Sequence, residues 1–99
     1  MLPRMKLEDI RRLRPQIDVI AKRHGATRMR IFGSVARGTA DEKSDVDFLV
    51  DLEAGRSLLD LSGLYLDLEA LLGTKVDVCT PNGLKQRIRA RVLEEAVPL

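Results

Sequence analysis

Residues 31 to 50, IFGSVARGTADEKSDVDFLV, join two short apolar segments through a Gly-Ser pair, a polar loop and two closely spaced aspartates. The second segment continues as DVDFLVDLE to residue 53 and has the alternation of a β-strand. Because successive side chains of a strand point to opposite faces, Asp45 and Asp47 are expected to share one face. Like charges placed in this way repel each other, and burying them is costly without compensation. This segment therefore requires either solvent or a ligand beside its two carboxylates.

Length and composition set the class of protein. The 99 residues predict a single domain, residues 1 to 99, with a small core, and 44% hydrophobic with 32% charged residues is typical of a soluble globular chain. Aromatic residues make up 3% of the chain and Trp is absent, which argues against platforms for stacking bases. The net charge of +2 permits contact with nucleic acid without requiring it, and direct binding of nucleic acid is not expected.

The cysteine count and the hydropathy of the chain indicate the cellular compartment of the protein. Cys79 is the single cysteine, so no internal disulfide can form. The chain has no apolar run close to the roughly 20 residues that cross a bilayer, and residues 1 to 10 lack the apolar stretch of a signal peptide. We expect a cytoplasmic protein without membrane contact.

The periodicity of apolar residues predicts an α/β fold with a small mixed sheet of about three strands and flanking helices. Pro15 interrupts the first helical pattern, which therefore predicts either two short helices or one that begins near Pro15. Ser34 is expected to cap a brief helix that Gly38 ends. A helix between the second and third strands has crossover length, so these strands are expected to be parallel. The remaining elements are strands at 27–32, 45–53 and 75–80 and helices at 57–73 and 84–96.

The helix at 57–73 carries two apolar stripes. One stripe is expected to face the core and consists of Leu61, Leu64, Leu68, Leu71 and Leu72. The other contains Leu59 and Leu66, with Gly63 and Ala70. This second stripe can either dock a partner protein or pack against the first helix.

A third carboxylate, Asp77, lies within the third strand between two valines. If this strand neighbours the second one, Asp77 stands beside Asp45 and Asp47. Three carboxylates on adjacent strands could hold two Mg²⁺ ions, an arrangement that suits nucleotidyl transfer. The alternative for each aspartate is a solvated sheet face or strand end, and that simpler interpretation is preferred for Asp51 and Glu53.

Gly33 and Ser34 suggest a phosphate-binding turn. A glycine lets the backbone approach a ligand closely, and the backbone N–H groups of the following short helix are suited to phosphate. Arg37 either contacts a phosphate as well or is an ordinary surface arginine. The stretch matches neither a P-loop nor a dinucleotide fingerprint.

His24 and Cys79 have structural explanations. His24 lies at a predicted helix end, where capping is favoured over catalysis. Cys79 is expected to be a packed strand residue rather than a nucleophile.

Gly33-Ser34, ten residues and then Asp45-x-Asp47 resembles the signature of the DNA polymerase β-like nucleotidyltransferase superfamily. The segments FGSVARG, SDVDFLVDLE and KVDVCTPNGL are similar to the minimal nucleotidyltransferases, and the resemblance extends over roughly residues 29 to 97. It implies a polymerase β-like nucleotidyltransferase fold. It also implies that Gly33 and Ser34 bind the nucleotide phosphates, that Asp45, Asp47 and Asp77 bind Mg²⁺, and that Asp77 helps to deprotonate the attacking hydroxyl.

The resemblance further implies a function. Minimal nucleotidyltransferases are the antitoxins of two-gene pairs whose toxin is a HEPN-domain ribonuclease. The implied reaction is a Mg²⁺-dependent protein adenylylation, in which AMP passes from ATP to a tyrosine hydroxyl of the toxin and inactivates it, as in a type VII-like pair. Two other functions stay open: an antitoxin that masks the toxin without chemistry, and a nucleotidyltransferase for a small molecule or an RNA end.

Overall fold

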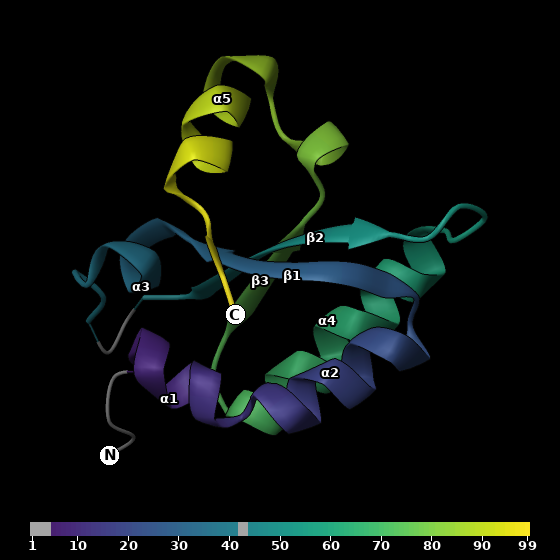
Figure 1. The fold of residues 1–99 in the computed structure, drawn as a ribbon, viewed down its shortest axis with the longest axis horizontal. Helices are drawn as coiled ribbons and strands as arrows, with labels where there is room; N and C mark the ends of the chain where they lie inside the picture. The colour runs from purple at the N-terminus through teal and green to yellow at the C-terminus, as the bar shows by residue number, and fades with distance from the viewer. Residues whose placement is uncertain (1–4, 42–43) are drawn as a thin grey trace.

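A four-stranded mixed sheet forms the centre of the molecule (Figure 1). The computed structural model describes residues 5–41 and 44–99. Its helices are α1 (Leu7–Arg12), α2 (Arg14–Arg23), α3 (Gly33–Arg37), α4 (Leu58–Leu72) and α5 (Gln86–Glu95), with a 3-10 turn η1 (Pro81–Gly83) before α5. Its strands are β1 (Ala26–Phe32), β2 (Val46–Leu52), β3 (Val76–Cys79) and β4 (Val97–Pro98).

The strand order is β3-β2-β1-β4. β1 pairs with β2 in antiparallel orientation, and β2 pairs with β3 in parallel orientation. The predicted α/β class and the parallel pair are thus confirmed. The expectation of about three strands missed β4, a two-residue strand that adds antiparallel to the outer edge of β1.

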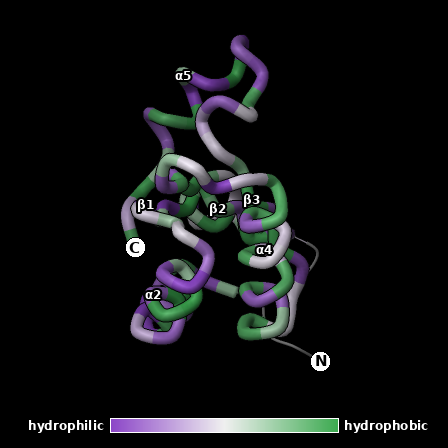
Figure 2. Tube along the Cα trace, turned by 90° about the vertical axis from the view of Figure 1, so that its right-hand side faces the viewer, coloured by the Kyte–Doolittle hydropathy of each residue, from purple (hydrophilic) through white to green (hydrophobic). Residues whose placement is uncertain are grey.

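The helices cover the two faces of the sheet unequally. α1, α2 and α4 lie on one face and α5 lies on the other, while α3 follows the end of β1 (Figure 1). Seen from the side, α2 and α4 stand on the opposite side of the strands from α5 (Figure 2). The main core lies under α2 and α4 and includes Ile17, Ile31, Val46, Phe48, Val50, Leu64 and Leu68, whose side chains are buried.

Pro15 separates the first helical segment into two short helices, which confirms one of the two predicted arrangements. Leu13 closes α1 and opens α2, and the proline occupies the first turn of α2. Proline is tolerated there because that turn has no intrahelical partner for its N–H.

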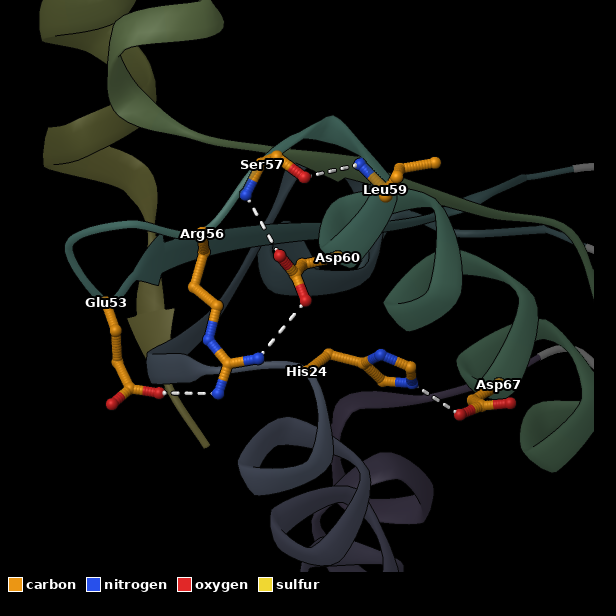
Figure 3. Close-up of polar contacts among 7 residues, drawn as sticks. All are labelled: His24, Glu53, Arg56, Ser57, Leu59, Asp60 and Asp67. Atoms are coloured by element: carbon orange, nitrogen blue, oxygen red, sulfur yellow. Dashed lines mark hydrogen bonds and ion pairs between the residues drawn. The ribbon is translucent and has the colours of Figure 1, made fainter.

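The start of α4 is fixed by polar contacts (Figure 3). The Ser57 hydroxyl accepts a hydrogen bond from the Leu59 N–H at 3.2 Å, and the Asp60 carboxylate accepts one from the Ser57 N–H at 2.9 Å. Arg56 donates to Asp60 and to Glu53, each at 3.2 Å. This reciprocal cap aligns α4 with the loop that leaves β2.

His24 joins α2 to α4, as Figure 3 shows. It caps the C-terminus of α2, as expected, and its Nε2 lies 2.6 Å from Asp67 Oδ2 on α4. Gly63 is required here, because a Cβ at this position would lie 2.6 Å from the imidazole ring. The close approach of the two helices therefore depends on this glycine.

The two stripes of α4 have different surroundings. Leu64, Leu68 and Leu72 are buried, and Leu61 and Leu71 pack against the same core, as predicted. Leu59 and Leu66 are 84% and 61% exposed, so of the two alternatives left open for this stripe, packing of these leucines against the first helix is wrong. Gly63 of the second stripe packs against His24, which caps α2. No helix among the described residues is long and apolar enough to cross a membrane.

Candidate active site

Two of the three predicted carboxylates lie side by side on neighbouring parallel strands. Asp47 on β2 is in register with Asp77 on β3. Asp45 lies just before β2 and is exposed, whereas Asp47 is partly buried. The parallel pairing predicted from the crossover helix thus brings Asp77 beside the aspartate pair.

The electrostatics of Asp47 are unfavourable for a carboxylate. Its pKa is raised from 3.8 to about 6, first because burial removes water from the carboxylate, and then because Asp77 and Asp45 repel its charge. Glu95 adds to this rise, and Arg37 opposes it. Asp47 is therefore the residue on which the charges of the site converge.

Gly33 brings the backbone against this carboxylate. Phe32, the last residue of β1, pairs with Asp47, so the chain turns into α3 directly beside it. Gly33 has φ +75°, and a Cβ at this position would lie 2.1 Å from Asp47 Oδ2. Both the left-handed backbone and the lack of space require glycine here. The predicted phosphate-binding turn and the predicted metal-binding residues are therefore adjacent.

Ser34 occupies a different position from the one expected. It lies inside α3, whose N-cap is Phe32, and no side chain caps this helix. The prediction that Ser34 is the cap is wrong, because α3 begins at Gly33, one residue before Ser34. Gly38 ends α3 in the left-handed conformation, as predicted.

Arg37, at the end of α3, is held by a residue that the sequence did not single out. Its NH1 donates to Glu95 Oε1 at the end of α5 in an ion pair. The two residues are 58 positions apart, and no local pattern in the sequence indicates their contact.

Asp51 is also paired, which corrects the expectation of a purely solvated residue. Its carboxylate accepts a hydrogen bond at 3.2 Å from Arg30, whose side chain is buried. Asp51 thus balances a buried cation on the same sheet. Glu53 is exposed, as expected, and pairs with Arg56.

The surroundings of Cys79 disfavour its thiolate form. Its pKa is raised to about 11, because it is partly buried and because Asp77 repels the thiolate. This agrees with the expectation of a packed strand residue.

The donor set of the site fits a divalent cation in its chemistry. Among residues 5–41 and 44–99, no three acidic, histidine or cysteine side chains stand in an arrangement that would hold a metal ion. Asp47 and Asp77 nonetheless lie in register on neighbouring strands, and, after burial, repulsion from Asp77 and Asp45 raises the Asp47 pKa. A hard cation would relieve that repulsion, and carboxylate oxygens are the ligands that Mg²⁺ prefers.

Comparison with known proteins gives consistent matches. Residues 13–99 match the family model of the nucleotidyltransferase domain. A candidate protein adenylyltransferase of Methanocaldococcus jannaschii, MJ0435, is 44% identical over 93 residues, which cover 94% of this chain and 97% of that protein. The protein adenylyltransferase MntA of Thermococcus cleftensis is 46% identical over 78 residues, which cover 79% of each chain.

Two solved structures share the fold. A candidate minimal nucleotidyltransferase superposes with a TM-score of 0.84 at 53% identity and covers 96% of this chain and 97% of its own. A toxin–antitoxin structure with AMP-PNP superposes with a TM-score of 0.71 at 19% identity and covers 85% of this chain and 69% of its own, a likeness of fold alone. The predicted minimal-nucleotidyltransferase fold is confirmed.

Proposed function

From the premise that the chain belongs to the nucleotidyltransferase domain family, we propose that it transfers AMP from ATP to a tyrosine hydroxyl of a partner protein. The observation that carries this proposal is the position of Asp47, between the Gly33 turn on one side and Asp77 on the other. Groups suited to phosphate and groups suited to a cation thus meet at one carboxylate. The names of the adenylyltransferase relatives support a protein as the acceptor.

In the proposed reaction the hydroxyl oxygen attacks the α-phosphorus of ATP. The new P–O bond forms as the bond to the bridging oxygen of the β-phosphate breaks, and pyrophosphate leaves. The hydroxyl proton passes to the Asp77 carboxylate, which lies beside Asp47 on the neighbouring strand. Gly33 and Ser34 bind the phosphates through backbone N–H groups and the serine hydroxyl, and Arg37 adds a charged donor.

Asp45, Asp47 and Asp77 would hold Mg²⁺, and two ions are expected by analogy with the family. When bound, such cations neutralise the charge that develops on the entering and leaving oxygens. The chain's own contribution is to hold three carboxylates on a rigid pair of strands, beside the turn that positions the phosphates.

We propose further that the partner is a HEPN-domain ribonuclease toxin and that its adenylylation inactivates it in the cytoplasm. The toxin–antitoxin structure among the matches supports a toxin as partner. The exposed leucines of α4, Leu59 and Leu66, offer a docking surface for it. A partner that presents the acceptor is consistent with this fold, because the described residues form one small sheet with its helices and connecting loops.

The test is transfer of labelled AMP from ATP to the co-purified partner in the presence of Mg²⁺. Asp45→Asn is expected to abolish the label, because it removes a carboxylate charge from the site. Glu53→Gln is the matched control, because Glu53 lies exposed just beyond the same strand. Intact transfer by Asp45→Asn would contradict the assignment of the site.

A masking antitoxin gives a different result in cells. If binding alone neutralises the toxin, Asp45→Asn protects cells as well as the wild-type chain does. If the acceptor is a small molecule or an RNA end, the chain transfers label to it without a partner. We expect neither result.

A further inference from the structure

The Arg37–Glu95 ion pair ties the nucleotide side of the site to α5. Arg37 is the last residue of α3, and Glu95 is the last residue of α5. The Glu95 side chain is 19% exposed, whereas that of Arg37 is 54% exposed. The Glu95 side chain is thus mostly buried, while more than half of the Arg37 side chain is open to solvent.

The position of Glu95 is set by the C-terminal strand. β4 follows α5 after one residue, and its Val97 pairs with Ile31 of β1. Ile31 in turn lies two residues before Gly33, where the chain turns into α3. β1 therefore pairs with the strand that follows Glu95 and also leads directly into the proposed phosphate turn. Through β1, the position of Glu95 is linked to the position of that turn.

The guanidinium keeps donors for a second partner. Arginine carries five N–H donors, and the pair with Glu95 uses the NH1 nitrogen. Arg37 borders a cavity of about 920 Å³ between α1 and α3 on one side, and a shallow hollow with Arg91 and Glu94 on the other. Both Arg37 and Glu95 influence the Asp47 carboxylate, in opposite directions, so both lie within electrostatic range of it.

We propose that Glu95 is a positioning residue for the nucleotide, which holds Arg37 so that its remaining N–H groups bind a phosphate oxygen of ATP. This inference rests on the proposed function insofar as it takes ATP as the nucleotide. Long arginine side chains lose rotational freedom when they bind, and a fixed carboxylate that orients the guanidinium beforehand reduces this loss.

The direction in which Glu95→Gln changes the affinity for ATP distinguishes positioning of Arg37 from simple charge repulsion. Glu95 is an anion near the expected position of a polyphosphate, so Coulomb repulsion alone predicts that Glu95→Gln binds ATP more tightly. Positioning predicts weaker binding, because the released Arg37 must be ordered by the nucleotide itself. Glu94→Gln is the matched control, since it removes the same charge from an exposed side chain one residue away.

The experiment measures the Kd of α,β-methylene-ATP with Mg²⁺ by calorimetry. We expect Glu95→Gln to raise the Kd about threefold, in the range of a surface ion pair, and Glu94→Gln to leave it unchanged. A lower or unchanged Kd for Glu95→Gln would overturn the proposal, as would a wild-type chain that does not bind the analogue.

A double-mutant cycle separates positioning from a general loss of structure. Arg37→Gln is expected to raise the Kd about tenfold, and adding Glu95→Gln should then have no further effect. An equal effect of Glu95→Gln in both backgrounds would mean that Glu95 acts by another route and would overturn the proposal. The expected pattern of Kd values, found in a chain that transfers no AMP to its partner, would support the inference while contradicting the proposed function.

Discussion

The two faces of β2 differ although they alternate along the same seven residues. Val46, Phe48 and Val50 point into the main core under α2 and α4 and are at most 1% exposed. Asp47 and Asp51 lie on the other face, where one has a raised pKa and the other balances a buried arginine. The first face thus provides stability, while the second holds the buried Leu49 together with the Asp47 carboxylate, whose charge repulsion a ligand would relieve.

The largest effect is expected on the core face. Phe48→Ala removes a fully buried side chain and leaves a cavity, so the free energy of unfolding should fall by about 3–5 kcal/mol. Urea denaturation followed by circular dichroism measures the change. A loss below about 1 kcal/mol would contradict the assignment of this face to the core.

Gly33→Ala probes the border between the two faces. The substitution forces a Cβ into the left-handed region and against Asp47 Oδ2, so we expect a loss of about 1–2 kcal/mol and of most nucleotide affinity. Gly55→Ala is the control, because Gly55 has φ +87° and open space at its Cβ. If both variants bind the nucleotide equally well, the close approach at Gly33 has no role in binding.

Asp47→Asn should stabilise the chain while it inactivates the site. The folded state raises the Asp47 pKa from 3.8 to about 6, so the folded chain binds more protons between these values and loses stability as the pH rises through them. Asparagine cannot ionise, and we expect a gain of about 1 kcal/mol at pH 8, after a discount for the solvent around a half-buried group.

The same variant should show little gain at pH 4, where the wild-type carboxyl is protonated in the fold. Urea denaturation at both pH values provides the comparison. An equal gain at pH 4 and pH 8 would indicate that packing, rather than charge, is responsible.

The smallest effect on stability is expected at the surface of α4. Leu66→Asp changes an exposed side chain, so the free energy of unfolding should stay within about 0.5 kcal/mol of wild type, while the affinity for the partner falls. Val19→Asp, at a 59% exposed position on α2, is the control. Wild-type affinity of Leu66→Asp in calorimetry would place the partner elsewhere.

Much of this arrangement could be predicted from local patterns. Alternation along β2 assigned its two faces, and the length of the α4 crossover predicted that β2 and β3 are parallel. Asp77 was expected beside Asp47 on the condition that these strands are neighbours. Both inferences depend on the geometry of single elements. β4 could not be found in this way, because two residues that include a proline carry no periodicity.

Ion pairs between residues far apart in the sequence could not be predicted from local patterns either. The contacts of Arg37 with Glu95 and of Arg30 with Asp51 join residues 58 and 21 positions apart, and they depend on how the elements pack. Ser34 was misplaced for a related reason. Position 33 must be glycine, because the backbone there has φ +75° and Asp47 leaves no room for a side chain, and this constraint comes from another strand.

The most direct test of the charged face is the pKa of Asp47, followed by carbon-13 NMR of its carboxyl group. Without ligands we expect a pKa of about 6, and with Mg²⁺ and α,β-methylene-ATP a value well below the ordinary one, because cations favour the ionised carboxylate. A pKa that does not change when Mg²⁺ and the analogue are added would contradict the conclusion that these carboxylates form a nucleotidyl-transfer site.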